Sequence, residues 1–434
     1  MTDPVIVVGA GFAGCEAAWL LAEHGIPVRL YEMKPVRYSP AHEREGFAEL
    51  VCSNSFKAIR PESAAGLLKE EMRLLGSILL PCADLHQVPA GGALAVDRNA
   101  FSDEVTRRIS AHPGIEIIRE EVTDIPEGEA ILATGPLTSD ALAESIRALC
   151  GGALSFYDAA APIITADSID MGKAFFASRY DRGDEEDYIN CPFDKEEYQL
   201  FYDALVCAEK AATHNLDKDE RVYEGCMPIE VMAKRGADTM RFGPLRPVGL
   251  RDPRTDKRPW AVVQLRRENT QGSLYNIVGF QTNLKFAEQK KVFSLIPGLE
   301  NLEIVRYGVM HRNTFIDSPR LLDETFRFRS RSNLYFAGQI TGVEGYMESA
   351  LSGLVAAHAI LRRREGHSPY EFGPDTMTGS LTRYISDPSV KDFQPMGANM
   401  GILAPLTERI KGKQARYAVL AQRANSSMKH TLDR

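Results

Sequence analysis

The chain has 434 residues, of which 44% are hydrophobic and 25% charged. This balance excludes a disordered or fibrous protein, and the length predicts roughly two or three packed units. The formal net charge of -8 argues against a protein whose whole surface is positively charged and binds nucleic acid indiscriminately. Since the sequence has no run of about 18 uncharged apolar residues and no basic leader, we expect no membrane span and a cytoplasmic location.

The first 32 residues predict a strand, a glycine-rich turn, a helix and a second strand. The apolar strand 5–8 leads into the pattern G-x-G-x-x-G, and the strand 27–31 ends at Glu32. In this pattern Gly9 makes the tight turn, Gly11 lets the backbone approach a pyrophosphate and Gly14 brings the helix against the strand. An acid at the end of the second strand is placed to bind ribose hydroxyls. The predicted dinucleotide-binding residues are therefore Gly9, Ala10, Gly11, Phe12, Ala13, Gly14 and Glu32.

Further along, helices are predicted at 61–76 and 98–111, and a buried strand at 131–133. Between about 156 and 298 the pattern changes to mixed strands and acidic loops, and a nucleotide-type pattern returns at 333–345 before a helix at 346–364. We therefore predict a discontinuous first domain, 1–155 with 300–434, and an inserted second domain, 156–299. A tail rich in proline and glycine leads to a predicted basic helix at 405–423.

The distant glycines predict FAD rather than NAD as the dinucleotide. The strand that ends near Gly338 delivers Gly342, Gly345 and Tyr346 to the start of a long helix, whose N-terminus would favour negative charge on a reduced flavin ring. This element resembles the C-terminal FAD element of the two-dinucleotide-binding-domain flavoproteins, and Thr134 with Gly135 resembles their strand-ending motif. Because no second G-x-G-x-x-G is present, we expect NADH or NADPH to act only as a transient reductant.

The seven cysteines have no C-x-x-C pair and no metal-ligand spacing, which predicts reduced thiols and no bound metal. We expect the thiols of Cys15, Cys82, Cys150 and Cys207 to be buried, whereas Cys191 stays undecided. Two others are candidates for chemistry. Cys52 lies in a loop of hydroxyls and an amide near a lysine, and Cys226 follows a glycine that opens space beside the sulfur.

Charge is segregated along the chain. Residues 234–267 hold ten Lys and Arg against three acids, and residues 383–434 hold nine against four. From charge alone, a solvated basic face is the favoured interpretation, and a local polyanion site is the alternative. The candidate phosphate-binding residues of the first segment are Arg241, Arg246, Arg251, Arg254, Lys257 and Arg258.

Six motifs together resemble those of the folate- and FAD-dependent tRNA (uracil-5-)-methyltransferases. They are G-A-G-F-A-G-C-E-A-A from residue 9, V-C-S-N-S-F-K from 51, E-G-C-M-P-I-E from 224, M-R-F-G-P-L-R-P-V-G-L from 240, G-F-Q-T-N-L from 279 and G-V-E-G-Y-M-E-S from 342. The resemblance covers the whole length and implies an α/β fold, with a Rossmann-like FAD-binding domain related to the GidA/MnmG type and an inserted mixed α+β domain.

The same resemblance implies an enzyme that makes ribothymidine in the T-loop of tRNA. Methylenetetrahydrofolate would give the carbon and FADH2 the electrons. Cys52 and Cys226 are implied as the catalytic pair, one as nucleophile and the other as carrier or base, with the order left open. The implied partners are tRNA and folate, with no obligatory protein partner, and the basic segments become candidate tRNA surfaces.

Two alternatives remain. The first is the paralogous wobble-uridine-modifying flavoprotein. Members of that family are longer than this chain, and both the length of this chain and its C-S-N-S-F-K loop argue against it. The second is a non-catalytic, FAD-stabilised tRNA-binding module with inert thiols. Replacing Cys52 or Cys226 with Ala separates the enzyme from the binding module.

Overall fold

The computed structural model describes residues 3–152, 154–159, 161–181, 187–211, 227–390 and 393–434. A five-stranded parallel sheet lies at its centre. Its strands follow the order β16 (Leu334–Phe336), β7 (Ala130–Leu132), β1 (Val5–Val8), β2 (Val28–Tyr31) and β6 (Ile115–Ile118). All three residues of β7 and of β16 are buried, as is usual where helices cover a parallel sheet. The predicted α/β class is confirmed.

Two helices that begin at the glycine-rich segments pack directly against each other. They are α1 (Phe12–Glu23) and α11 (Tyr346–Arg364). Their backbones come so close that a Cβ atom on Gly353 would overlap the carbonyl oxygen of Ala13. This contact sets both helix N-termini beside the carboxyl ends of β1 and β16. Helices α4 (Arg98–Ala111) and α5 (Asp140–Cys150) complete this part of the fold.

A small antiparallel sheet supports the loop that contains Cys52. Its strands follow the order β3 (Ser55–Ala58), β5 (Ala93–Val96) and β4 (Gln87–Val88), flanked by α2 (Ala64–Leu74) and α3 (Leu79–Leu85). The buried Lys69 of α2 donates hydrogen bonds to the carbonyls of Phe56 and Ala58. The ammonium group therefore ties α2 to the strand that follows the loop.

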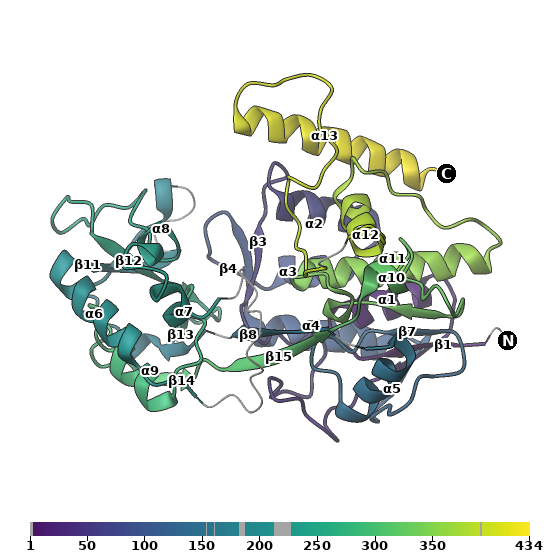
Figure 1. Ribbon diagram of the computed structural model, residues 1–434, viewed down its shortest axis with the longest axis horizontal. Coiled ribbons are helices and arrows are strands. Elements are labelled where there is room, and N and C mark those ends of the chain that lie inside the picture. The colour runs from purple at the N-terminus through teal and green to yellow at the C-terminus, as the bar shows by residue number, and fades with distance from the viewer. Residues whose placement is uncertain (1–2, 153, 160, 182–186, 212–226, 391–392) are drawn as a thin grey trace.

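A second, antiparallel sheet forms the left-hand part of Figure 1. Its strands follow the order β10 (Phe175–Phe176), β11 (Tyr188–Phe193), β12 (Ala261–Arg267), β13 (Leu274–Ile277), β9 (Ile163–Thr165) and β14 (Ile304–Arg306). The accompanying helices are α6 (Lys195–Cys207), α7 (Ile229–Ala233), α8 (Thr239–Phe242) and α9 (Phe286–Phe293). The long antiparallel pair β8 (Leu154–Ala159) and β15 (Met310–Phe315) joins this part to the parallel sheet.

The buried apolar side chains form two large clusters. One is built from residues between 5 and 146 and between 315 and 428, and the other from residues between 164 and 302. The residue ranges of the two clusters are close to those of the two predicted domains, 1–155 with 300–434 and 156–299. The domain boundaries themselves stay predictions. The short helix α10 (Ser318–Leu321) and α12 (Met377–Ser386) belong to the first cluster.

The prediction for the C-terminal helix was wrong in its bounds. Helix α13 spans Lys413–Leu432 and not 405–423. Its N-cap is Gly412 at a φ of 89°, a backbone conformation that suits glycine and starts the helix there. The helix expected at 61–76 is also shorter, because Ser63 caps α2 at its start by accepting a hydrogen bond from the Gly66 N–H.

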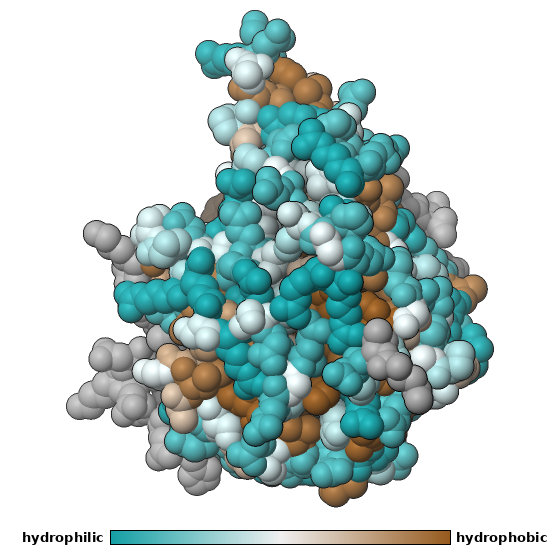
Figure 2. All heavy atoms as spheres, turned by 90° about the vertical axis from the view of Figure 1, so that its right-hand side faces the viewer, coloured by the Kyte–Doolittle hydropathy of each residue, from teal (hydrophilic) through white to brown (hydrophobic). Residues whose placement is uncertain are grey.

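The face on the right of Figure 1 is mostly hydrophilic, with short apolar stretches between the polar side chains (Figure 2). Within the described ranges, no helix has both the length and the apolar character needed to cross a membrane.

Candidate functional site

The glycine-rich turn after β1 contains glycines of two kinds. A Cβ atom on Gly9, whose φ is 100°, would lie 2.6 Å from the carbonyl oxygen of Ala133, and one on Gly14 would overlap the carbonyl oxygen of Gly9. Gly11 differs, because its φ is -76° and a Cβ atom there would meet nothing within 4 Å. The fold itself therefore requires Gly9 and Gly14, whereas Gly11 faces open space that a ligand can fill.

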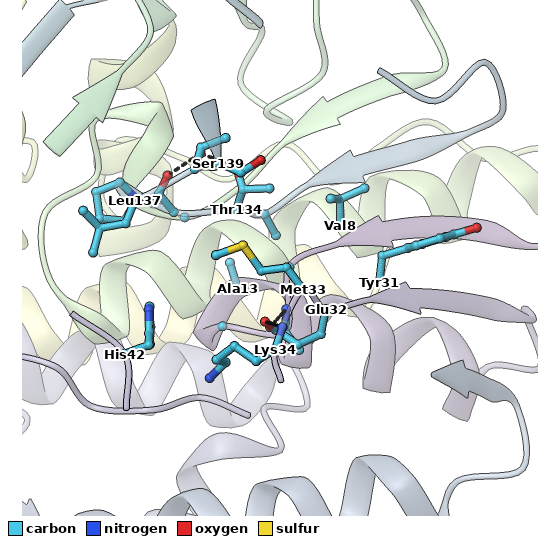
Figure 3. A pocket seen from close by; sticks show the side chains of 18 of the residues that line it. Val8, Ala13, Tyr31, Glu32, Met33, Lys34, His42, Thr134, Leu137 and Ser139 are labelled. Atoms are coloured by element: carbon cyan, nitrogen blue, oxygen red, sulfur yellow. Dashed lines mark hydrogen bonds between the residues drawn. The ribbon is translucent and has the colours of Figure 1, made fainter. Parts of the chain in front are cut away.

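That space is part of a cavity at the carboxyl ends of the parallel strands, the edge at which ligands bind in open sheets of this kind. In Figure 3, Thr134, Leu137 and Ser139 lie on one side of it, and Glu32, Lys34 and His42 on the other. At the start of α1, no described side chain caps the helix, so its N–H groups and positive dipole end are available to an anion. The predicted residues that line the cavity are Gly9, Ala10, Gly11, Phe12, Ala13, Glu32, Thr134, Gly135, Gly338 and Tyr346.

Glu32 is fixed in place by two backbone groups. One carboxylate oxygen accepts the N–H of Ala10 and the other accepts the N–H of Lys34, each at 3.0 Å. A carboxylate has about four acceptor positions, so capacity remains for two ligand hydroxyls. The side chain is buried at the end of β2 and lines the cavity, the position at which ribose binding is predicted.

The second glycine-rich segment contributes to the cavity in part. Gly338 lines it and donates its N–H to the Ser352 hydroxyl at 2.6 Å. Gly342 and Gly345, which were predicted to bind the cofactor, lie outside the lining, as does Gly14. A Cβ atom on Gly342 would overlap the Phe393 ring, and one on Gly345 would overlap the Glu348 carboxylate. Gly342 and Gly345 also have φ values of 83° and 122°, so packing and backbone conformation explain both glycines, and their cofactor role stays a prediction.

Several lining residues lay beyond sequence reasoning. The ammonium group of Lys34 donates to the Gly46 carbonyl at 2.7 Å and pairs with Glu49 at 3.2 Å, and the side chains of Lys34 and Glu49 are both buried. The lining also includes His42, Glu49, Val51, Leu137, Ser139, Gln339 and Ser349. Most of these residues lie in loops with no periodic pattern. The position of Lys34, two residues after the acid that is predicted to bind ribose, was the one available signal.

Tyr346 links the cavity to the Cys52 loop. Its ring stacks on Phe12 with the ring centroids 4.7 Å apart. Its hydroxyl oxygen lies 2.9 Å from the backbone nitrogens of Val51 and Cys52, and 3.2 Å from the Cys52 sulfur. The candidate nucleophile is therefore held against a residue that lines the cavity. Cys226, its predicted partner, lies outside the described residues.

Arginines from the second sheet hold the same loop from the other side. Arg306 donates to the Val51 carbonyl at 2.6 Å, and Arg266 donates to the Ser53 hydroxyl and the Asn54 side-chain carbonyl, each at 2.8 Å. Arg98 of α4 donates to the Leu50 carbonyl and pairs with the buried Glu268 at 3.0 Å. The loop thus lies at the junction of the two sheets, within a cluster of guanidinium groups.

The other described cysteines are not placed for catalysis. Burial raises the pKa of the Cys15 and Cys191 thiols well above the usual range, and raises those of Cys82 and Cys150 to about 11. The expectation of burial was wrong for Cys207, which is exposed at the end of α6, and Cys150 at the end of α5 is only partly buried. The described residues contain no group of three His, Cys, Asp or Glu side chains that could hold a metal ion.

Three arginines of the basic segment pair with nearby acids, and two of these three are also exposed. Arg241 lies 3.7 Å from the Trp260 ring centroid and pairs with Asp238. Arg254 pairs with Asp252 at 2.6 Å, and Arg251 pairs with Asp256 at 3.5 Å. The exposed members are Arg246, Arg251, Arg254, Lys257 and Arg258. Arg254, Lys257 and Arg258 also line a surface hollow with Lys173, Lys195 and Trp260.

Known proteins share this fold. The family model described as "Glucose inhibited division protein A" matches residues 4–368. A solved structure, Aquifex aeolicus GidA, superposes with a TM-score of 0.71 at 16% identity, covering 99% of this chain and 73% of that one. At this identity the likeness shows the fold alone.

Two curated relatives match at much higher identity, and both are named methylenetetrahydrofolate–tRNA-(uracil-5-)-methyltransferase TrmFO. The protein from Acetivibrio thermocellus is 58% identical over 431 residues, covering 99% of this chain and 98% of its own. The protein from Ligilactobacillus salivarius is 56% identical over 430 residues, with the same coverage. The resemblance seen in the sequence motifs is therefore confirmed, and the chain belongs to the methylenetetrahydrofolate–tRNA-(uracil-5-)-methyltransferase (TrmFO) family.

Proposed function

We propose that the cavity binds FAD and that the Cys52 loop beside it carries out the pyrimidine chemistry of this family. Membership makes the chain a folate-dependent enzyme that methylates uracil C5 in tRNA, with methylenetetrahydrofolate as the carbon donor. The observation that carries the site assignment is the contact between Cys52 and Tyr346, because it brings a thiol to the edge of a dinucleotide cavity. The expected target is the T-loop uridine, and we propose a cytoplasmic location, since tRNA is the substrate.

The residues of the cavity fit FAD at three points. The N–H groups at the start of α1 and the open space before Gly11 suit the pyrophosphate. The Glu32 carboxylate suits the hydroxyls of the adenosine ribose and would repel a 2′-phosphate. Gly338 and Tyr346 at the far end leave room for an aromatic ring system. When bound, reduced FAD supplies the hydride that turns a methylene carbon into a methyl group, with NADH or NADPH as the proposed reductant.

A thiolate is needed because uracil C5 is a weak nucleophile. We assign this role jointly to Cys52 and Cys226: one sulfur adds to C6, which gives C5 enolate character and lets it bond to the methylene carbon of the folate. The proton on C5 then leaves to a base, for which the second thiol is the candidate, and the bond between the methylene carbon and the folate nitrogen breaks, so that tetrahydrofolate departs and an exocyclic methylene group stays on C5. After hydride reaches the methylene carbon, the C6–sulfur bond breaks and ribothymidine is released. Arg98, Arg266 and Arg306 hold the Cys52 loop in position for these reaction steps through their hydrogen bonds to it.

We propose the exposed cations of residues 246–258 as one tRNA contact, because phosphate contacts supply much of nucleic-acid affinity. Arg241 is better explained as a structural residue, since Trp260 and Asp238 both engage it.

The test uses three tRNA transcripts with the purified FAD-loaded enzyme, methylenetetrahydrofolate and NADH or NADPH. One transcript is unmodified, the second has cytidine in place of the T-loop uridine, and the third has cytidine in place of the wobble uridine. We expect 5-methyluridine in the first and third transcripts and none in the second. Loss of product from the third transcript alone would move the enzyme to the wobble-modifying class.

A further inference from the structure

The Tyr346 hydroxyl is surrounded by groups of the Cys52 loop. The N–H groups of Val51 and Cys52 both point to its oxygen at 2.9 Å, the N–H of Ser53 lies at 3.5 Å and the Cys52 sulfur lies at 3.2 Å. A tyrosine hydroxyl has one proton to donate and two lone pairs that can accept hydrogen bonds. This small set of donors and acceptors determines the direction of the bond to sulfur.

The two N–H groups must donate, so the phenolic oxygen already accepts two hydrogen bonds at good length. The Cys52 S–H group would be a third donor, and the phenolic oxygen has no lone pair left to accept its proton. The O–H proton needs an acceptor, and among the described neighbours of the hydroxyl the Cys52 sulfur is the one that can accept it. We propose that Tyr346 is a positioning residue that donates its O–H to Cys52 and stabilises the sulfur as a thiolate.

The surroundings support this direction. Burial, followed by the adjacent Cys52, raises the pKa of the Tyr346 hydroxyl well above 10, so it remains a donor at every working pH. The charged groups packed around the loop are the guanidinium groups of Arg98, Arg266 and Arg306 and the carboxylate of Glu268. Three cations and one anion favour negative charge on the sulfur.

The inference rests on the proposed role of Cys52 and adds a function for Tyr346 beyond lining the cavity. A hydrogen bond to an ionised sulfur is stronger than one to a thioether. It therefore favours the Cys52 thiolate. In the assignment where Cys52 is the sulfur that adds to C6, the bond acts before attack and again when the C6–sulfur bond breaks, where it makes sulfur a better leaving group. The phenol gains and loses no atoms in either step.

The test measures the reactivity of the sulfur directly. Full-length, FAD-loaded wild-type enzyme and Tyr346→Phe are treated with iodoacetamide between pH 5 and 10, and alkylation of the Cys52 peptide is followed by mass spectrometry. Exposed Cys207 serves as the reference thiol in the same sample. Tyr384→Phe is the matched control, because Tyr384 donates to the Gln394 carbonyl away from the loop. FAD content and Tm report whether each variant is folded.

In the wild type, we expect the rate of Cys52 alkylation to rise at a clearly lower pH than that of Cys207. In Tyr346→Phe, the Cys52 profile should move up by about one pH unit and the rate at pH 7 should fall roughly tenfold. The Cys207 profile should not change. The kcat for methylation should fall while the KM for tRNA holds, and Tyr384→Phe should match the wild type in every readout.

An unchanged Cys52 profile in folded, FAD-loaded Tyr346→Phe would overturn the inference. If that variant does not fold, the wild-type comparison decides, since equal profiles for Cys52 and Cys207 would also overturn it. These readouts do not depend on methylation. A wild-type enzyme that alkylates as expected but makes no ribothymidine would contradict the proposed function and leave the inference standing.

Discussion

Replacing Gly11 by alanine should remove FAD without unfolding the protein. The backbone of Gly11 has a φ of -76°, which any residue can adopt, and the added methyl group would meet no protein atom within 4 Å. Alanine is a poorer helix N-cap than glycine by about 0.5–1 kcal/mol, but it lowers the entropy of the unfolded chain by a similar amount. The Tm of the FAD-free protein should therefore change by only a few degrees.

The same methyl group projects into the space proposed for the pyrophosphate. Overpacking of a fitted contact costs about 1–3 kcal/mol, which corresponds to a Kd for FAD that is weaker by roughly 5- to 150-fold. The assay is fluorescence titration of the apoprotein with FAD, together with the absorbance of the purified protein near 450 nm and its Tm.

Gly14→Ala is the matched comparison. Its methyl group would overlap the Gly9 carbonyl oxygen and also lies 3.5 Å from the Ala133 side chain, so this variant should lose stability as well as FAD. An unchanged Kd for FAD in Gly11→Ala would refute the placement of the pyrophosphate. Equal loss of Tm in the two variants would refute the distinction between the fold-requiring and ligand-facing glycines.

Three further results are expected. Cys52→Ala should retain FAD but lose at least about 10³-fold in methylation rate, measured by single-turnover assay; normal turnover would favour the binding-module alternative. Lys257→Ala combined with Arg258→Ala should weaken tRNA binding and reduce the slope of log K against log salt by about 2, whereas Arg241→Ala should mainly lower the Tm; an unchanged slope in the double variant would point to helix α13. Burial raises the pKa of Glu71 from 4.5 to about 7, so the folded state binds this proton more tightly and stability should fall, by roughly 3 kcal/mol at most, as pH rises from 4.5 to 7; urea unfolding of Glu71→Gln should show a flatter pH dependence, and an unchanged one would contradict the assignment.

Local signals account for the elements that were predicted with correct bounds. The strand Val5–Val8 was predicted with these bounds from its apolar residues next to a glycine pattern, and the same pattern predicted the turn and a helix after it, without bounds for that helix. The helix Arg98–Ala111 has an N-cap, Asp97, whose side chain accepts the N–H groups of Asn99 and Ala100. The C-terminal helix was misplaced because its start depends on the conformation of one residue, Gly412, within a basic segment that has little periodicity.

Long-range contacts could not be predicted. Cys52 and Tyr346 are 294 residues apart in the sequence, yet their side chains are in hydrogen-bonding contact. Arg266 and Arg306 reach the Cys52 loop from strands of the other sheet. Sequence motifs marked the loop and the helix start separately, but only the packing of the two sheets shows that they belong to one site.

The source of the methyl carbon tests the account most directly. The FAD-loaded enzyme is incubated with unmodified tRNA, NADH or NADPH, and methylenetetrahydrofolate labelled with ¹³C in its methylene carbon, and the T-loop nucleosides are analysed by mass spectrometry. A parallel reaction contains unlabelled folate and S-adenosylmethionine labelled in its methyl group. The account predicts ribothymidine that contains the folate label in the first reaction and no label in the second. Label from S-adenosylmethionine, or no ribothymidine from a protein that holds FAD and binds tRNA, would contradict it.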